Sequence, residues 1–468
     1  MEGYLLDYDV LILGGGIVGC AAAYELSKYS LNIALIEKDY DIADDAAIIN
    51  TAIIYDGAEC EDTLMAKLEA LGSSMMPEIT SKFNIPYKKF GYMIIAQDEA
   101  SARKINNIYN TAIARGIPNL RMLTSEEVYK MEPDINIKVV NAIYSKNTAI
   151  VSPYDLAIAY GEVAFDNGVN FKLEEEVLDI KKINKGYRVI TNKNKFTCHM
   201  VINTTPSKDF SIEAAERQEI SKFSRNYFLL DEKIPLKFNS VISVINETED
   251  KTYIIPTIQG NSVALQISEG VPDYKTSLEK VSGVMGSISE NNIHSYLSSP
   301  FYNEPIIIDD SSIHQGYIKV TGKHYGEITM TPAIAKIVCE TITSNMNCVL
   351  KKNFIDKRRE FYRFKNMNNR ERNEIIKYNK NYGKIVCSCN CVTEGEIVDS
   401  IRRPLGARTI EGIKRRTGAM EGSCNGAQCM LKIARILSRE TGKRLCDIVK
   451  DSKNSKLVVA RIKEFDGM

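Results

Sequence analysis

The chain has 468 residues, of which 44% are hydrophobic and 26% charged. Those proportions are typical of a globular protein long enough for two or three domains with sizeable cores. The 60 basic and 60 acidic side chains balance, so no global field selects nucleic acid or an anionic surface as a partner. The first residues do not resemble a signal peptide, and no run is apolar for long enough to span a bilayer. We therefore expect a cytoplasmic protein that is peripheral to a membrane only through a partner.

A glycine-rich turn lies near the start of the chain. An apolar, strand-like run at residues 10–13 leads into Gly14, Gly16 and Gly19, and small and apolar residues typical of a helix follow. This G-x-G-x-x-G spacing lets the backbone approach a pyrophosphate, which the N-terminus of the helix then binds. Glycine triplets also occur in ordinary turns, but the strand before and the helix after favour a dinucleotide-binding site.

The second strand supports the same interpretation. Residues 32–36 form an apolar run that ends in Glu37, whose carboxylate can accept hydrogen bonds from the ribose of an adenosine. The distance from the glycine turn is the one expected for such a fingerprint. We also place Lys38 and Val177 at the predicted cofactor site.

The remaining elements follow from periodicity and capping signals. A capping box of Thr124 and Glu127 begins a short helix, and Ser152 caps a helix with Pro153 at its first position. Further helices are expected at residues 63–83, 101–115 and 331–343, the last opened by Thr331. Strands are expected at residues 92–96, 142–144, 170–173, 176–182, 186–191, 200–203 and 316–320. Strand-like runs between 228 and 267 predict an antiparallel sheet in a second domain.

Four stretches of the sequence carry a resemblance to a known family. They are DVLILGGGIVGCAAAYEL, NTAIIYDGAECEDTLMAKL, TPAIAKIV and YGKIVCSCNCVTEGEIVDSIRRPLGARTIEGIKRRTGAMEGSCNGAQC. Over nearly its whole length the chain resembles the D-amino-acid-oxidase-like FAD oxidoreductases of the glycerol-3-phosphate dehydrogenase and 2-hydroxyglutarate oxidase kind. It resembles the version that ends in a domain like bacterioferritin-associated ferredoxin.

This resemblance implies FAD as the dinucleotide and a small hydroxy acid or polyol phosphate as the substrate. Electrons would leave through the flavin or an iron–sulfur cluster to an acceptor protein, a redox partner subunit or a quinone. The implied fold class is α/β: a Rossmann-like FAD-binding domain, an inserted α+β substrate domain with an antiparallel sheet, and a small helical [2Fe–2S] domain.

The expected domain limits follow from this fold. The FAD-binding domain comprises residues 1–84, 145–206 and 313–350, and the substrate domain comprises residues 85–144 and 207–312. Residues 351–384, with twelve Lys or Arg against four Asp or Glu, are expected to form a basic, solvated linker; a docking face for an acidic partner is the alternative. Residues 385–446 form the [2Fe–2S] domain, and residues 447–468 form a tail.

Five of the eleven cysteines crowd between residues 387 and 429, which favours a metal site over disulfides. Cys387 and Cys389 form one close pair, and Cys424 and Cys429 form the other. Four thiolates can hold a [2Fe–2S] cluster. Zinc also takes four cysteines, usually as paired CxxC knuckles, so the CxC and Cx4C spacing and the resemblance favour iron–sulfur. Cys391 is a fifth thiol that we interpret as a spare, with exchange for Cys389 left open.

The flavin-ring side of the sequence departs from the family. Tyr55 aligns with the family's usual histidine near the flavin, and His324 lies in the stretch that normally faces the ring, so we predict catalytic roles for both. Asp44 and Asp45 replace small and hydroxyl residues beside the pyrophosphate, where carboxylates would repel it. The arginine expected to bind the substrate's anionic group has no clear counterpart. A non-catalytic or electron-transfer subunit is therefore the alternative to a dehydrogenase.

Overall fold

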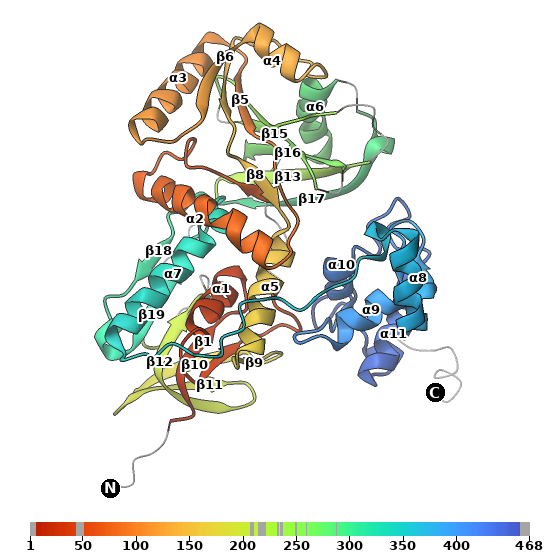
Figure 1. Cartoon of the computed structure of the whole chain (residues 1–468). Helices are drawn as coiled ribbons and strands as arrows, with labels where there is room; N and C mark the ends of the chain where they lie inside the picture. The colour runs from red at the N-terminus through yellow and green to blue at the C-terminus, as the bar shows by residue number, and fades with distance from the viewer. Residues whose placement is uncertain are drawn as a thin grey trace.

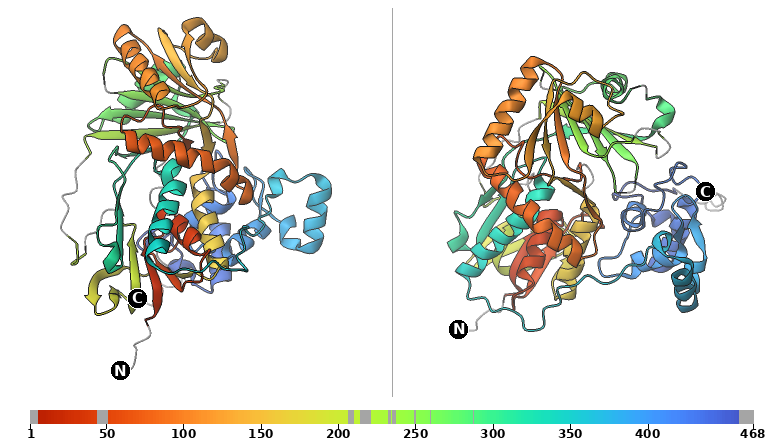
Figure 2. Two further views of the ribbon diagram at one scale, coloured as in Figure 1. Left: turned by 60° about the vertical axis from the view of Figure 1, so that its left-hand side comes forward. Right: turned by 45° about the horizontal axis from the view of Figure 1, so that its top comes forward.

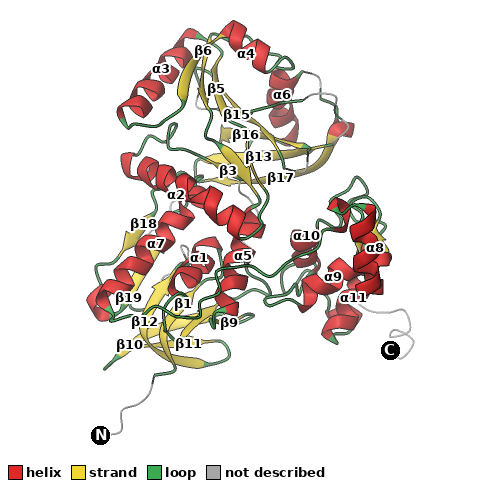
Figure 3. Ribbon diagram, in the orientation of Figure 1, coloured by secondary structure: helices red, strands yellow, loops and turns green. Residues whose placement is uncertain are grey.

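The computed structural model describes residues 6–43, 51–205, 210–213, 221–231, 234, 237–248, 250–258, 260–286 and 288–458. Three parts are visible in Figure 1: a lower α/β part with the N-terminus, an upper part built on a large sheet, and a small helical part to one side. Figure 3 shows how strands and helices divide among these parts. The two further views of Figure 2 show the helix α2 (Thr63–Lys82) between the lower and upper parts.

The lower part contains a mostly parallel sheet. Its parallel strands run in the order β9, β2, β1, β12, β19, and β10, β11 and β18 add antiparallel pairs. Their bounds are β1 (Tyr8–Leu13), β2 (Ile33–Ile36), β9 (Asn170–Lys172), β10 (Val177–Ile183), β11 (Gly186–Thr191), β12 (Lys195–Asn203), β18 (Ile307–Asp309) and β19 (Tyr317–Thr321). The predicted return of residues 316–320 to the first sheet is confirmed, because β19 pairs with β12.

Three helices pack together beside this sheet: α1 (Ile17–Leu26), α5 (Pro153–Asp166) and α7 (Glu327–Asn345). Nearly all residues of α1 are buried, and several of them have small side chains. The small side chains allow α5 and α7 to approach α1 closely. The rings of Tyr24, Phe83 and Tyr160 pack edge to face or tilted, with centroids 5.3–5.8 Å apart. This aromatic contact fixes α1 and α5 against the end of α2.

The upper part is a second, eight-stranded sheet in the order β17, β13, β16, β15, β14, β5, β7, β6. Its neighbouring strands are antiparallel, as predicted, except that β14 and β5 are parallel. The bounds are β5 (Tyr92–Ala96), β6 (Leu120–Thr124), β7 (Asn141–Ser145), β13 (Phe223–Leu230), β14 (Val241–Ile245), β15 (Lys251–Pro256), β16 (Ser262–Glu269) and β17 (Ile293–Phe301). The strands β3 (Ile53–Ile54), β8 (Ala149–Val151) and β4 (Tyr87–Lys89) form a separate small sheet, in that order, and do not pair with the large one.

Alternation along β5 divides the upper part into two cores. Met93 and Ile95 pack in one core with the helices α4 (Ser125–Met131) and α6 (Tyr274–Met285), whereas Ile94 packs in the other with α3 (Glu99–Ala114). Successive side chains of a strand point to opposite faces of the sheet, so one apolar run supplies both cores. The second face carries Tyr92, and Tyr55 from the loop after β3 and Tyr325 from the segment before α7 pack against it.

The C-terminal part has its own core of apolar side chains. It contains β20 (Ile385–Cys387), β21 (Val392–Thr393), α9 (Glu394–Arg402), α10 (Ile410–Thr417) and α11 (Met430–Thr441), and α8 (Asn369–Tyr378) precedes it. Thr393 and Glu396 form a capping box at α9, and the Thr409 hydroxyl accepts the Gly412 N–H at the start of α10. Local capping therefore begins the first two of these helices.

Residues 351–363 form a strap between α7 and the C-terminal part, and the strap crosses in front of α1 and α5 in Figure 1. Its arginines are paired: Arg358 lies 2.6 Å from Glu162, and Arg359 lies 2.6 Å from Asp166, both acids being on α5. The segment that we expected to be a solvated linker is therefore tied to the lower part by ion pairs, and it contains the helix α8.

One predicted helix start is wrong. We expected a helix opened by Thr331, but α7 begins at Glu327 and contains Pro332 in its second turn. The Thr331 hydroxyl does not cap the helix, because it donates backwards to the Glu327 carbonyl at 2.8 Å. A Cβ built at Gly72 of α2 would lie 1.9 Å from the Thr329 carbonyl oxygen, so the first turn of α7 is fixed by close packing on α2.

Candidate functional site

The glycine turn joins β1 to α1, and each of its glycines has a different environment. Gly14 has φ +101°, which favours glycine, and a Cβ at Gly19 would lie 2.0 Å from the Gly14 carbonyl oxygen. A Cβ at Gly16, in contrast, would meet no described atom within 4 Å. Gly14 and Gly19 are therefore required by the fold, whereas Gly16 leaves open space at the N-terminus of α1, where no described side chain caps the helix. This is the arrangement that a pyrophosphate needs.

Glu37 lies at the end of β2 and contacts the turn directly. Its Oε2 accepts the Gly15 N–H at 2.6 Å and its Oε1 accepts the Asp39 N–H at 2.9 Å. Burial raises the pKa of the Glu37 carboxyl, and the two N–H donors oppose that effect. Each carboxylate oxygen has a second lone pair, so Glu37 keeps acceptors for a ribose.

The other two predicted cofactor residues lie in or next to strands of the lower sheet. Val177 begins β10 and packs in a core with Leu13 and Ile36, the last residues of β1 and β2. Lys38 is exposed and lies 3.8 Å from Asp39. Their roles in binding a cofactor stay predictions.

The turn after β12 closes over the glycines. The Thr204 hydroxyl donates to the Leu13 carbonyl at 2.8 Å. A Cβ built on Gly14 would lie 3.0 Å from the oxygen of that hydroxyl. Asp44 and Asp45, which we expected to lie beside the pyrophosphate, are outside the described residues. The described part of the turn fits closely around Gly14.

Tyr55 and His324, the two predicted catalytic residues, both contact the ring of Tyr325. The Tyr55 and Tyr325 ring centroids are 4.9 Å apart, and the His324 and Tyr325 centroids are 4.3 Å apart. Burial lowers the pKa of His324 to about 4, and its Nδ1 accepts the Gly326 N–H at 3.0 Å. His324 is therefore a neutral imidazole at neutral pH and a weak base, which makes its predicted role in proton transfer less favourable.

Sequence reasoning missed a polar group on the inner face of the upper sheet. Lys251 Nζ lies 2.7 Å from Glu59, and Glu59 also accepts the Tyr92 hydroxyl at 2.5 Å. Burial alone would lower the pKa of Lys251, but attraction to Glu59 outweighs it and raises that pKa. The Lys251 side chain keeps 39% of its surface accessible. No motif pointed to this pair, because its members are 192 residues apart in the chain.

The four predicted cluster cysteines come together in the C-terminal part. Cys389 Sγ lies 3.6 Å from Cys424 Sγ. Burial, together with the charge and hydrogen bond of the neighbouring Cys387, raises the pKa of the Cys429 thiol to about 12, so these two cysteines also lie close together. Cys387 and Cys429 are buried, whereas Cys389 is exposed. The site therefore has one buried side and one side that faces the surface.

The loop that carries the second cysteine pair is shaped around the first pair. A Cβ at Gly422 would lie 2.2 Å from the Cys389 Cβ, so glycine is required for this approach. Met420 and Asn425 have φ values of +69° and +47°, left-handed conformations that are costly for residues with a side chain unless the surroundings fix them, and Gly426 follows at +81°, which glycine adopts freely. Cys391, with φ +53°, turns the chain beyond the first pair.

The C-terminal part docks on the lower part through buried charges. Arg416 binds Asp41 with two hydrogen bonds, of 2.5 and 2.7 Å, and the two side chains are 3% and 1% exposed. Arg403 binds Glu162 of α5 at 2.8 Å. On the other side, the Asn425 side chain donates to the His294 carbonyl of β17 at 3.4 Å. The cysteine loop is thus held between the glycine-turn part and the edge of the upper sheet.

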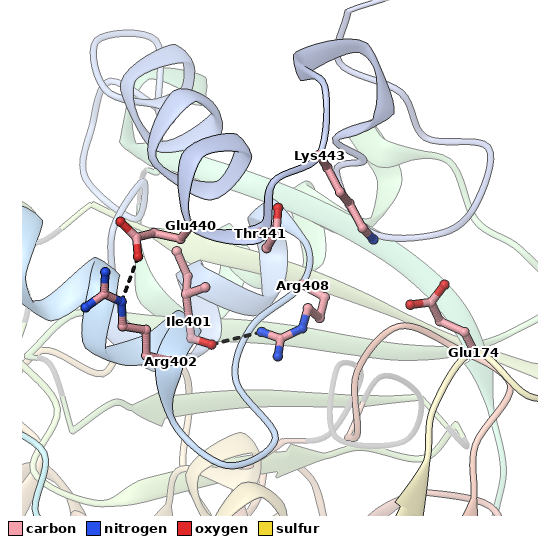
Figure 4. A pocket seen from close by; sticks show the side chains of 7 residues that line it. All are labelled: Glu174, Ile401, Arg402, Arg408, Glu440, Thr441 and Lys443. Atoms are coloured by element: carbon pink, nitrogen blue, oxygen red, sulfur yellow. Dashed lines mark hydrogen bonds and ion pairs between the residues drawn. The ribbon is translucent and has the colours of Figure 1, made fainter.

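A cavity of about 450 Å³ lies where the C-terminal part meets the lower part (Figure 4). Lys443 extends toward Glu174, Arg408 donates to the Ile401 carbonyl at 2.9 Å, and Arg402 is paired with Glu440 at 2.7 Å.

Among the described residues, no helix is both long and apolar enough to cross a membrane.

Comparisons with known proteins agree with this geometry. The FAD dependent oxidoreductase family matches residues 9–341, and the BFD-like [2Fe-2S] binding domain matches residues 385–439. The chain is 34% identical to a glycerol 3-phosphate dehydrogenase of Caloramator mitchellensis, across 97% of this chain and 99% of the relative. It is 27% identical to a glycerol 3-phosphate oxidase of Mycoplasma pneumoniae, over 54% of this chain and 69% of the relative.

A solved structure of L-alpha-glycerophosphate oxidase from Mycoplasma pneumoniae, with FAD bound, shares the fold. Its TM-score is 0.65 at 23% identity, and the match covers 75% of this chain and 98% of that one. The open space at Gly16 fits the FAD pyrophosphate, and the four thiols fit a [2Fe–2S] cluster. The chain therefore belongs to the FAD-dependent oxidoreductases, in a form that carries a C-terminal BFD-like [2Fe–2S] binding domain.

Proposed function

We propose that this oxidoreductase acts on a small hydroxy acid or polyol phosphate of the glycerol 3-phosphate type, and that electrons leave through the [2Fe–2S] domain to a partner. The observation that carries the proposal is the docking of the four-cysteine domain against the part that holds the glycine turn, through Arg416 and Asp41. FAD, when bound, supplies the chemistry for oxidising a C–H bond beside a hydroxyl group.

Lys251 is the residue that we assign to the substrate's anionic group. Its side chain is 39% exposed, and it extends from the sheet face that carries Tyr92 and against which Tyr55 packs. Its partner Glu59 keeps the ammonium charged, since attraction between them raises the pKa of Lys251 despite burial. A lysine acts as a point charge toward phosphate or carboxylate. It would replace the arginine that the resemblance led us to expect elsewhere.

The cysteine loop supports a path for electrons out of the chain. Asn425 binds the backbone of β17 in the upper part, and Cys389 of the same site is exposed. One side of the cluster site thus lies against the catalytic parts, and another side is open to an acceptor.

The test is anaerobic titration of the FAD-loaded protein while the flavin absorbance is recorded. We expect glycerol 3-phosphate to bleach the flavin band and glycerol, which lacks the phosphate, to do so only at far higher concentration. Lys251→Met should raise the concentration of glycerol 3-phosphate needed by about tenfold or more, as for loss of a charge-assisted contact of about 1.5 kcal/mol.

Lys104 is the matched control, because it is an exposed lysine of α3 that bonds only the backbone of residues 246 and 247 among the contacts described. Lys104→Met should titrate like the parent. Failure of glycerol 3-phosphate and of 2-hydroxy acids to bleach the bound flavin would refute the proposal. Equal effects of the two lysine substitutions would refute the assignment of Lys251.

A further inference from the structure

Three buried side chains with metal-ligating groups meet where α2, α7 and the loop after β3 come together. Cys60 lies in that loop, Glu69 lies on α2, and His324 precedes α7. One ligating atom from each lies within 4.8 Å of the other two, and all three residues are buried. We propose that Cys60, Glu69 and His324 bind a divalent cation of the zinc type.

Glu69 is the side chain that most needs such a ligand. It is 1% exposed, and its Oε1 has no hydrogen-bond partner among the described residues. A buried polar atom without a partner costs free energy, and buried carboxylates are ordinarily paired or bound to a metal. The same Oε1 lies 3.9 Å from His324 Nδ1, so the unpartnered atom points to the imidazole.

The chemistry of the three groups selects the cation. Thiolate and imidazole ligands favour zinc, whereas magnesium and calcium take oxygen ligands. In a tetrahedral zinc site, bond lengths of 2.0–2.3 Å place ligating atoms about 3.3–3.6 Å apart. Glu69 Oε1 and His324 Nδ1 are 3.9 Å apart, so these two atoms need to approach each other only slightly to bind the same ion. A thiolate and a carboxylate also balance the two positive charges of the ion.

The surrounding backbone holds the three groups in place. A Cβ at Gly326 would lie 2.1 Å from Glu69 Oε1 and 3.2 Å from His324 Nδ1, so glycine is required where the loop closes over them. Arg115 donates to the carbonyls of Cys60 and Glu61 and so fixes the loop that carries the thiol. His324 Nδ1 accepts the Gly326 N–H, and binding of a metal at Nδ1 would exchange that hydrogen bond for the ion.

The proposal gives His324 a ligating role in place of the proton-transfer role predicted from the sequence. Three protein ligands leave a fourth position for water, as in zinc sites that are not purely structural. The site is separate from the cluster cysteines, which belong to a different domain and core.

The test uses the full chain with its cluster loaded, so that the cluster cysteines are occupied, and cobalt(II) as the probe. We expect about one cobalt per chain, with absorption typical of thiolate-bound tetrahedral cobalt. Cys60→Ser should abolish the thiolate band, and Glu69→Gln should weaken binding by more than about tenfold. Cys339→Ser is the matched control, since Cys339 is also 4% exposed but lies on α7 away from the three groups.

Retained FAD and circular dichroism show whether each variant folds, and His324→Gln provides a second, more conservative change. The proposal would be overturned if the parent bound no cobalt or zinc at micromolar concentration. It would also be overturned if the cobalt spectrum were unchanged in Cys60→Ser and His324→Gln. Substrate bleaching of the flavin is recorded separately, so failure of this site and failure of the proposed function are distinguishable.

Discussion

The buried pair of Asp41 and Arg416 should control whether the cluster domain stays docked. Asp41→Asn removes the charge while keeping the shape, and it leaves the Arg416 guanidinium buried without a counter-ion. Breaking a buried ion pair in this way costs about 3–5 kcal/mol. Arg416 also donates to the carbonyls of Leu405 and Gly412, so we expect the lower end of that range. The fraction of undocked molecules should then rise by about a hundredfold.

Trypsin cleavage in the strap of residues 351–363 measures that fraction, since cleavage follows the open population when opening and closing are fast. Glu374→Gln is the control: it removes an exposed ion pair with Arg370 on α8, in which the two side chains are 61% and 87% exposed, and it leaves every lysine and arginine of the strap in place. Exposed pairs contribute less than about 1 kcal/mol, so its cleavage rate should change only a fewfold. If Asp41→Asn were cleaved no faster than Glu374→Gln, the reasoning about docking would be wrong.

Three further outcomes are expected. Gly16→Val should abolish FAD retention but leave the iron content unchanged, because its side chain enters the space that the pyrophosphate needs and meets no described protein atom; equal FAD content in variant and parent would contradict the site. Cys424→Ser should remove the iron, of which the parent should hold about two atoms per chain, whereas zinc without iron would refute the cluster. Burial would raise the pKa of Glu162, but the charges and hydrogen bonds of Arg358 and Arg403 together lower it below its ordinary 4.5, so the stability that this carboxylate contributes is present above that pH and lost as the pH falls through the lowered value. Hydrogen exchange in the strap should rise on acidification in the parent, and Glu162→Gln should show high exchange at every pH; a parent-like profile in that variant would contradict the assignment.

Features that depend on neighbouring residues could be predicted from the sequence. The glycine turn, the capping box that begins α4, the Ser152 cap of α5 and the strand at residues 92–96 are confirmed. Each is set by hydrogen bonds or side-chain alternation within a few residues, so the local sequence contains the whole signal. The predicted start of α7 is wrong because the local signal was misleading. Thr331 is a residue type that often caps helices, but its hydroxyl donates to the preceding turn.

Contacts between distant parts of the chain could not be predicted. Glu59 meets Lys251 across 192 residues, and Asp41 meets Arg416 across 375. Neither pair has a spacing that a motif could reveal, because the fold alone brings the two members together. The group of Cys60, Glu69 and His324 has the same character, and only the crossing of α2 and α7 places its members within reach of one ion.

Transfer of electrons from substrate to cluster within one chain is the central claim. The most direct measurement is the electron paramagnetic resonance signal of the reduced [2Fe–2S] cluster, recorded anaerobically after glycerol 3-phosphate is mixed with the FAD-loaded protein. We predict that the signal forms in the parent and is absent in Gly16→Val, which keeps the cluster but should not retain FAD. Formation of the same signal in both proteins, or its absence in a parent whose flavin is bleached, would contradict the account.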